Sequence, residues 1–477
     1  MLFYSLDFWL VLPIGILMYH LTPFKYRWGL LLLGSIVFIG FISVSFLFYV
    51  VIFSIVNYYF GIILDKQNNP LKTKLYHWFL AVNIVQLVLF KYINFLIDNV
   101  NVIGRLFHFN IPYLNIIIPV GISYYTFQSI GYLINIYRNV EKPEKHFGYF
   151  LIYNLFFPKF MSGPIERSNK FFPQIHRPNR INPVDFEQGI LLIISGFFKK
   201  LIIAERLSVI VNNVYGQLDH FTGYPLWVVM FLQTIYIYAD FSGYTDIALG
   251  IGKLLGLNLT NNFMRPFFSP NVSVFWRRWH ISLSSWFNDY MFKTLMFKKR
   301  KWGKMAAVYA VFLTFLVIGL WHGPNWTFVI LGILQGIAIN YEFFTKRTRK
   351  KIGAKIPEFW NKFLSRIITF TFMSFSLIFF FSPNMKKATY FVSHLFDFKH
   401  SKLFGNNLGL DHHNILIFLI AFFSLMLIEA LGERGINLSV KISNKPFWLR
   451  WSLYYGIVLV IFLYSYFATS NFIYVRF

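Results

Sequence analysis

The chain has 477 residues, of which 56% are hydrophobic, 21% aromatic and only 13% charged. An ordinary soluble domain is about one-quarter charged, so this composition excludes a soluble globular protein and predicts a polytopic membrane protein. The formal net charge of +26 would suit nucleic-acid binding, but the basic residues lie in short loops between apolar runs, as the positive-inside rule predicts, so we exclude nucleic acid as a partner. The absence of cysteine excludes disulfides and thiolate chemistry.

Apolar runs in the N-terminal part of the chain predict five membrane spans. The first covers residues 6–22. The run 28–64 has no charged residue and, as one helix, would be about 55 Å long against a hydrocarbon core of about 30 Å, so we expect it to fold back between residues 40 and 45. The fourth span is expected at about 76–97, and the fifth in a stretch that ends at Arg138.

An apolar stretch at 148–160 is too short to cross the membrane, because stretches of roughly 10 to 14 residues are typical of re-entrant or interfacial segments. It ends in FPKFMSGPIER, in which Gly163 and Pro164 interrupt any helix. Non-helical backbone at membrane depth persists only where protein or a wet cavity surrounds it. Two interpretations stay open, a break that faces a cavity and an ordinary cytoplasmic turn.

Two adjacent lysines, Lys199 and Lys200, stand in the body of the next predicted span, 186–211. A lysine side chain can extend toward the membrane surface, but two at this depth predict a polar interior face. The following span, 225–239, runs into ADFSGYTDIALGIGKLLGLN. The glycines of that segment permit close contact between helices; they are Gly243, Gly250 and Gly252.

Five further spans complete the chain, at about 305–322, 325–344, 367–382, 413–431 and 451–469. Loops 293–304 and 346–355 each contain six basic residues and no acidic residue, so both are predicted to be cytoplasmic. Counting from them gives about twelve spans, places both termini outside and puts His322 toward the outer half of the membrane. Because neither a repeat of about 20 to 50 residues nor a soluble domain is visible, we predict a single membrane domain over residues 1–477.

Residues 262–326 form the predicted catalytic core, and both of its histidines, His280 and His322, directly follow a tryptophan. An ionisable group at membrane depth is costly and therefore points to function, and a neutral imidazole can accept a proton from a hydroxyl. The alternative is that both rings are hydrogen-bonded inside the protein and inert.

The separation of these two histidines depends on how the segment 275–290 lies. Residues 305–320 would form a helix about 24 Å long, so a segment lying flat on the cytoplasmic face would leave His280 a span's length from His322. We predict that the segment is re-entrant and that both rings approach one tunnel. The alternative is an interfacial belt whose arginines face lipid phosphates, formed by Trp276, Arg277, Arg278, Trp279 and Trp286.

The motifs WRRWHISLSSWF and GLWHG in a polytopic chain resemble the membrane-bound O-acyltransferases, and in particular the bacterial branch that acetylates exported polysaccharide such as alginate. PVGISYYTFQSIGY, SGPIER, ADFSGYTDIALGIG, NNFMRPF and WRRWHISLS recur in that branch in this order, and the resemblance covers most of the chain. It implies an all-α, multi-pass protein of the bacterial cytoplasmic membrane. About eleven or twelve tilted transmembrane helices, with re-entrant segments, would form a ring around a central tunnel.

The same resemblance implies that His322 is the catalytic histidine and His280 the second family histidine. It implies a cytoplasmic acyl thioester, expected to be acetyl-CoA, as the donor and an exported cell-surface polysaccharide as the acceptor. A separate extracytoplasmic acetyltransferase is a further partner that the sequence leaves open. No bound cofactor is expected, and no metal either, because there is no HExxH motif and His412 and His413 lie in a loop without a convincing acidic partner.

The last span, 450–477, ends in FIYVRF, which resembles the C-terminal motif of a small membrane peptide that works beside the D-alanyl branch of the family. The resemblance implies that Tyr474 is an acyl relay, and a phenolic ester is a good acyl donor because phenoxide, with a pKa near 10, leaves more readily than an alkoxide. The alternative is an aromatic anchor at the outer interface.

The expected mechanism has His322 as general base on the attacking hydroxyl. The donors that stabilise the oxyanion are not evident, and His280 and Asn325 are candidates only by their position in the motif. The residues predicted to line the tunnel or contact substrate are Trp276, Trp279, Ser284, Asp240, Asn325 and Arg265.

Three alternatives to acetyl transfer are considered. D-alanyl or other acyl transfer to teichoic acid is the nearest, but the D-alanyl system keeps the FIYVRF-like peptide separate. A transporter or flippase of wall precursors would explain the spans and the broken helices, but it predicts internal repeats and none is found. A structural subunit with a decayed site is disfavoured because both histidines are present.

Overall fold

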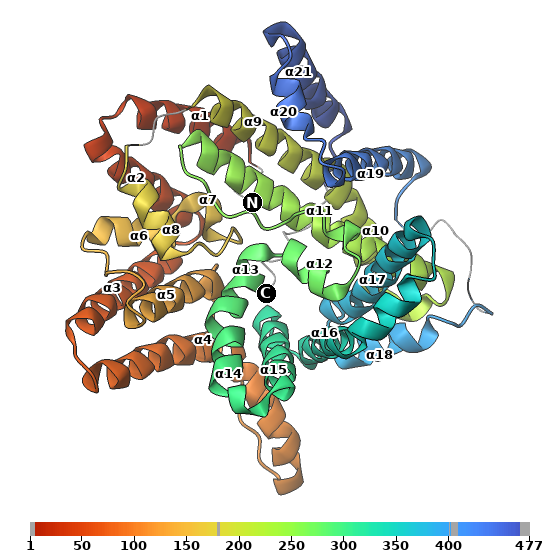
Figure 1. Cartoon of the computed structure of the whole chain (residues 1–477), viewed down its shortest axis with the longest axis horizontal. Coiled ribbons are helices and arrows are strands. Elements are labelled where there is room, and N and C mark those ends of the chain that lie inside the picture. The colour runs from red at the N-terminus through yellow and green to blue at the C-terminus, as the bar shows by residue number, and fades with distance from the viewer. Residues whose placement is uncertain (1–4, 179–181, 400, 402–408, 468–477) are drawn as a thin grey trace. The chain divides into compact units, whose positions relative to one another are not determined.

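The computed structural model describes residues 5–178, 182–399, 401 and 409–467, and within these ranges every regular element is a helix (Figure 1). Nine of the described helices are long and apolar enough to cross a membrane. They are α2 (Phe24–Ile42), α3 (Val44–Lys66), α4 (Leu71–Gly104), α11 (Tyr224–Leu254), α15 (Lys304–His322), α16 (Trp326–Gly353), α17 (Glu358–Phe381), α19 (His412–Glu433) and α21 (Phe447–Tyr464). The predicted all-α polytopic class is confirmed.

The three other predicted spans are also helical but are short or interrupted. α1 (Leu6–Leu21) and α5 (Ile122–Tyr137) have 16 residues each. The third is α9 (Pro183–Phe197), which continues through a π-helical turn, η3 (Phe198–Ala204), into α10 (Glu205–Gly216). Each of the twelve predicted segments therefore corresponds to helix.

The predicted fold-back of the run 28–64 occurs at Ser43, inside the expected interval. Its backbone is extended, and its hydroxyl accepts a hydrogen bond from the Phe46 amide at 3.4 Å, which caps α3. The predicted fifth span covered the stretch 116–138, but the helix is shorter, because Gly121, with a left-handed φ of 75°, precedes α5 and the helix begins only at Ile122.

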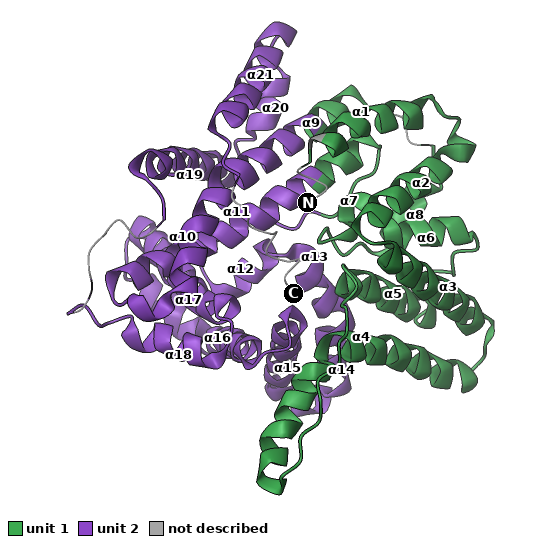
Figure 2. Cartoon of the chain, turned by 180° about the vertical axis from the view of Figure 1, so that it is seen from behind, with its two compact units in different colours: residues 1–189, 248–260 green, residues 190–247, 261–477 purple. Residues whose placement is uncertain are grey.

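The chain divides into two compact units (Figure 2). Unit 1 comprises residues 1–189 and 248–260, and unit 2 comprises residues 190–247 and 261–477. The predicted catalytic core, residues 262–326, lies entirely in unit 2. A single domain over the whole chain stays a prediction.

Unit 1 buries the SGPIER break. The short helices α6 (Phe147–Leu155), α7 (Phe157–Phe160) and α8 (Ser168–Ile175) surround it. Lys159 Nζ donates to Gln128 Oε1 at 2.8 Å, and the Glu166 carboxylate accepts from Thr260 Oγ1 at 2.9 Å. Protein therefore encloses the non-helical backbone, and hydrogen bonds satisfy the charged side chains beside it. Both are required for a break in a helix inside a membrane protein.

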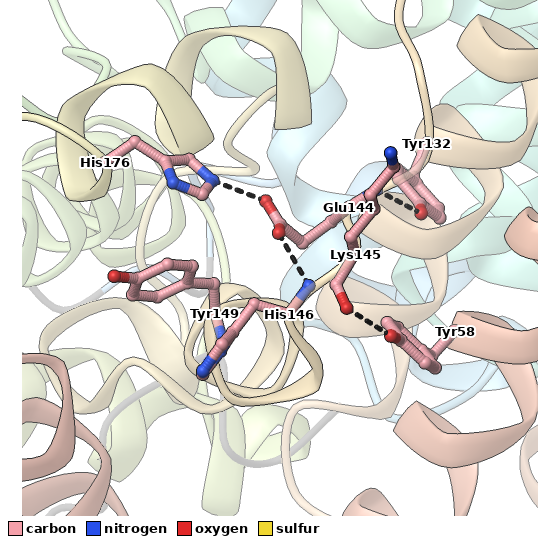
Figure 3. A network of polar contacts seen from close by, with 7 residues as sticks. All are labelled: Tyr58, Tyr132, Glu144, Lys145, His146, Tyr149 and His176. Atoms are coloured by element: carbon pink, nitrogen blue, oxygen red, sulfur yellow. Dashed lines mark hydrogen bonds and ion pairs between the residues drawn. The ribbon is translucent and has the colours of Figure 1, made fainter.

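The loop between α5 and α6 is held by a network around Glu144 (Figure 3). The Glu144 carboxylate accepts from the His146 amide at 2.8 Å and pairs with His176 Nε2 at 2.6 Å. The Glu144 amide donates to the Tyr132 hydroxyl at 3.1 Å, and the Tyr58 hydroxyl donates to the carbonyl of the next residue in the loop at 2.6 Å. These hydrogen bonds and the ion pair therefore hold the loop against α3, α5 and the end of α8.

The same loop contains a carboxyl group whose ionisation should make stability depend on pH. Burial raises the pKa of Glu141 from 4.5 to about 7, although hydrogen bonds from Ser168 and Asn135 oppose the shift. Between these two pKa values the folded protein holds a proton that the unfolded chain releases, so stability falls as pH rises from about 4.5 to about 7.

Glu141→Gln is expected to raise Tm at pH 8 and to change it little near pH 4, because glutamine resembles the protonated carboxyl group. Thermal melts of the detergent-solubilised protein at both pH values measure this difference. The matched control is Glu358→Gln, whose carboxylate is fully exposed and pairs with Lys362, and which should give no gain at pH 8. An equal Tm shift of Glu141→Gln at both pH values would contradict the assignment.

Candidate active site

His322 is positioned by a close crossing of α15 and α16. A Cβ on Gly319 would lie 2.3 Å from the Phe328 carbonyl oxygen, and one on Gly332 would lie 2.5 Å from that of Phe315. Only glycine allows the two backbones to approach this closely, and His322 is the last residue of α15 before the turn between them.

Asn325 caps the start of α16. Its side-chain oxygen accepts from the Thr327 amide at 3.0 Å, and its side-chain nitrogen donates to the Pro383 carbonyl at 2.8 Å. Both ends of the amide therefore fix the WHGPN turn, which is a structural role that the motif alone did not reveal.

The His322 side chain is 7% exposed and is surrounded by aromatic rings. Its ring centroid lies 4.9 Å from that of Trp321, 5.4 Å from Phe380 and 6.3 Å from Phe328. It also lines a cavity of about 30 Å³, which has room for about one or two water molecules. The other residues around this cavity are Ile237, Phe275, Trp276, Trp279, Leu331, Gln335, Met373, Ser376, Leu377 and Phe380.

A chain of hydrogen bonds supplies the polar wall of the cavity. Trp276 Nε1 donates to Gln335 Oε1 at 3.0 Å, and Gln335 Nε2 donates to Ser376 Oγ at 2.8 Å. Ser376 in turn donates to the Met373 carbonyl at 2.8 Å. Sequence reasoning missed Gln335 and Ser376, for which the only signal was a polar side chain inside an apolar helix.

Gln335→Leu is expected to destabilise the protein by about 1–3 kcal/mol, because it leaves the half-buried Trp276 N–H without its acceptor. A thermal melt measures the loss. In a Trp276→Phe background the same substitution should cost clearly less, and an equal cost in both backgrounds would contradict the coupling. The control on the same helix is Asn340→Leu, whose amide donates to the Val308 carbonyl at 3.3 Å and does not line the cavity.

His280 lies between α12 (Val272–Arg278) and α13 (Ile281–Phe287), with a left-handed φ of 44°. It is fully buried, and Asn262 fixes the turn that follows it. The Asn262 carbonyl accepts from the Ile281 amide at 3.0 Å, and its side-chain oxygen accepts from the Ser282 amide at 3.1 Å.

The two histidines share one aromatic neighbour. The His280 ring centroid lies 5.8 Å from that of Trp321 and 4.8 Å from that of Phe241, while His322 is next to the same indole. The two rings are therefore close together, which the re-entrant prediction requires, and the depth of the segment in the membrane stays a prediction. The segment therefore brings both rings into one cluster in unit 2.

Ion pairs and a helix cap determine the orientation of α12. The Glu342 carboxylate on α16 accepts from the Val272 amide at 2.6 Å and from the Ser273 amide at 3.0 Å, at the positive end of the α12 dipole. At the other end, Glu433 pairs with Arg278 at 3.0 Å and with Arg265 at 3.6 Å. Arg265 and Arg278 thus form ion pairs within the protein. Trp276, in α12, and Trp279, directly after it, line the cavity.

Of the residues predicted to line the site, the cavity brings together Trp276, Trp279 and His322. The four other residues lie outside the lining of the cavity and make contacts that stabilise the fold around it. Asp240 pairs with Lys200 at 2.6 Å, and the Ser284 hydroxyl donates to the Trp279 carbonyl at 3.1 Å. The contacts of Arg265 and Asn325 are those described above. Tyr474 lies outside the described residues. Among those that are described, no group of three or more histidine or acidic side chains could hold a metal ion.

The two buried lysines confirm the predicted polar interior face. In η3, Lys199 Nζ pairs with Asp246 Oδ2 at 2.8 Å, and Lys200 Nζ pairs with Asp240 at 2.6 Å and with Glu205 at 2.7 Å. The residue after Asp240 is Phe241, the ring that contacts His280. The charged cluster therefore supports one wall of the histidine site.

The crossing of α9 and α11 uses the predicted small residues. A Cβ on Gly243 would lie 2.8 Å from the Gly196 carbonyl oxygen, and one on Gly189 would lie 3.0 Å from that of Gly250. This proximity places the lysines of η3 directly against the acidic residues of α11.

Arg206, at the start of α10, holds the end of the described chain. Its Nη2 donates to the Tyr464 carbonyl at 2.9 Å and its Nε to Asn414 Oδ1 at 3.0 Å. The Tyr466 amide donates to the Leu201 carbonyl at 3.1 Å. The backbone is thus fixed eight positions before Tyr474.

Comparison with known proteins identifies the family and several relatives of this chain. Residues 139–382 match the model of the membrane-bound O-acyltransferase family. The chain is 32% identical over 393 residues to a protein of Pseudomonas syringae pv. tomato described as "probable alginate O-acetylase", with 81% of this chain and 73% of that relative covered. It is 29% identical over 411 residues to the peptidoglycan O-acetyltransferase of Helicobacter pylori, covering 79% and 76%.

A third relative is the teichoic acid D-alanyltransferase of Bacillus subtilis, 31% identical over 285 residues, which are 56% of this chain and 70% of that relative. These relatives are bacterial transferases of acyl groups, so the enzyme interpretation is confirmed over the transporter interpretation. Together with the nine apolar helices in the described part of the chain, the matches show that this protein is a multi-pass acyltransferase of the bacterial cytoplasmic membrane and belongs to the membrane-bound O-acyltransferase family.

Proposed function

We propose that this protein transfers an acetyl group from a cytoplasmic thioester, acetyl-CoA, to a hydroxyl group of an exported cell-surface polysaccharide. The observation that carries the proposal is a buried imidazole, His322, at the end of a membrane-length helix, where it lines a cavity with Trp276 and Trp279. The names of two relatives, which concern acetylation of alginate and of peptidoglycan, support this class of acceptor.

In the proposed reaction, His322 takes the proton of the attacking hydroxyl, which is the phenol of the relay residue Tyr474, as its oxygen attacks the thioester carbonyl. A carbon–oxygen bond forms, the tetrahedral oxyanion collapses with cleavage of the carbon–sulfur bond, and the thiolate recovers the proton from the imidazolium. Proton transfer of this kind contributes typically about 10²–10⁴-fold in rate. The aromatic walls exclude bulk water, which protects the thioester from hydrolysis.

The cavity accommodates only groups the size of water in this structure, and an acetyl thioester is larger. The side chains around it must therefore move when the donor enters. Trp276, which the Gln335 amide holds through one hydrogen bond of 3.0 Å, is the side chain that we expect to move. A tunnel that joins the two membrane faces is part of this proposal.

The proposal includes Tyr474 as a relay that carries the acetyl group as a phenolic ester. A hydroxyl of the exported acceptor then attacks this ester, the new carbon–oxygen bond forms as the phenolic carbon–oxygen bond breaks, and the phenol leaves with the proton of the acceptor. The anchored backbone at Tyr466, eight positions before Tyr474, supports the relay, because this anchor belongs to the same unit as His322. Tyr474→Phe should abolish surface acetylation. Tyr455→Phe, at an exposed position of α21, is the matched control, and full acetylation in Tyr474→Phe would exclude the relay.

The chemistry of the transferred group is tested by ester analysis of surface polymers from the wild type, a deletion strain and the complemented strain. Alkali-released acetate should disappear on deletion while ester-linked D-alanine stays unchanged. Loss of D-alanine instead would favour D-alanyl transfer, which the relative from Bacillus subtilis keeps as the second candidate. Recovery of the ester from isolated membranes given acetyl-CoA and polymer alone would show that no separate extracytoplasmic acetyltransferase is required.

A further inference from the structure

An apolar groove runs between α1 and α2 in unit 1, far in sequence from the histidine site. Its volume is about 430 Å³, within the range of small-molecule binding sites. Its floor is formed by buried side chains, Leu12, Tyr19, Leu31 and Phe38, while Val11, Val37 and Phe41 at its edge are 65%, 47% and 77% exposed. A groove with a buried apolar floor and exposed apolar edges on membrane helices opens toward lipid.

The groove has the length of an acyl chain in one leaflet. Its lining extends along α1 from Asp7 to Tyr19, a rise of about 18 Å, and half of the hydrocarbon core of a bilayer is about 15 Å thick. Two of its lining residues are glycines, Gly15 and Gly34, and a Cβ on either would meet no atom within 4 Å. Open space therefore exists in the middle of the groove, where larger side chains would fill it.

The two ends of the groove have opposite charge. At the Tyr19 end, the Arg27 guanidinium lies 5.2 Å from the tyrosine ring centroid and donates to the carbonyls of His20 at 3.1 Å and Thr22 at 3.0 Å. Lys25 adds a second cation in the same hairpin turn. Asp7 stands at the other end. A phosphate is attracted to the first end and repelled from the second, which gives a bound lipid one orientation.

We propose that this groove binds one acyl chain of an anionic glycerophospholipid whose phosphate lies beside Arg27 and Lys25. The site is distinct from the histidine cavity, since all of its lining residues belong to unit 1. The lipid would complete the packing of the α1–α2 hairpin, where the rings of Phe8, Phe38 and Phe157 already form one cluster. Its role is to hold the short helix α1 on the protein, independently of the acyl group that the enzyme transfers.

The first test is native mass spectrometry of the full-length protein titrated with dioleoyl phosphatidylglycerol. The wild type should retain one such lipid, and Gly34→Leu should bind it at least about tenfold more weakly because leucine fills the groove. Gly29→Leu is the control on the same helix, since its Cβ also meets no atom within 4 Å but the residue does not line the groove. Arg27→Gln should weaken phosphatidylglycerol about fivefold and leave neutral diacylglycerol unchanged.

The second test needs no variant, so a folding defect cannot obscure it. Phosphatidylglycerol with a photoreactive group in its acyl chain is bound to the wild-type protein in nanodiscs, illuminated, and mapped by peptide analysis. Labelling should concentrate in residues 5–41 and be displaced by unlabelled phosphatidylglycerol. Labelling confined to other helices, equal displacement by diacylglycerol, or undiminished lipid retention in Gly34→Leu would each overturn the proposal.

Discussion

Replacing His322 with alanine should lower acyl transfer by about 10²–10⁴-fold, the usual contribution of a positioned general base. Its ring packs between Phe328, Phe380 and Trp321, so its removal leaves a small aromatic cavity and only a moderate loss of stability. The measurement is the ester content of surface polymer in a strain that produces the variant at the wild-type level.

The matched control is His413→Ala, which should keep full activity. This exposed residue lies in the first turn of α19 and not in a loop as predicted, because Asp411 caps the helix directly before His412. His322→Gln separates proton transfer from packing, because glutamine fills part of the space but cannot act as a base at neutral pH. If either His322 variant kept normal ester content at normal abundance, the acid–base role of this residue would be excluded.

Lys200→Met should cause the largest loss of stability of any single substitution considered, about 3–5 kcal/mol, because it leaves two buried carboxylates without their shared cation. Asp240 and Glu205 are almost completely buried, so water cannot replace the lysine. Thermal melts in detergent and the amount of protein in the membrane measure the effect. Ester content should fall as well, since Asp240 precedes the Phe241 ring beside His280.

Lys293→Met is the control, because that lysine pairs with Asp289 at the surface and its loss should cost less than about 1 kcal/mol. Neutralising the partners in the same chain, with Asp240→Asn and Glu205→Gln, should restore much of the stability lost in Lys200→Met. A Lys200→Met protein as stable as the wild type would contradict the ion cluster.

Much of the fold could be predicted because membrane spans are recognised from long apolar runs alone. The turn at Ser43 follows from the excessive length of the run 28–64, and the buried ion pairs follow from the cost of two lysines at membrane depth. The continuation of α11 to Leu254 was harder to predict. Its polar residues looked like the end of a span, but the lysines of η3 neutralise them and the helix continues.

The histidine site was only partly predictable. Trp276 and Trp279 could be placed near His322 because they belong to the same predicted catalytic core, residues 262–326, and the structure puts all three at one cavity. Gln335 and Ser376 could not, because a polar side chain in an apolar helix does not reveal its partner. The contact of His280 with Trp321 depends on one left-handed residue, whose backbone conformation no local pattern of the sequence indicates.

The indole of Trp321 couples the positions of the two imidazoles during turnover. Each ring uses it as a wall, so a rotation of this one side chain displaces both imidazoles together. The surroundings of His280 and His322 therefore change together. A substitution that reshapes the surroundings of one histidine will also alter those of the other, even when the substituted residue does not contact that second histidine.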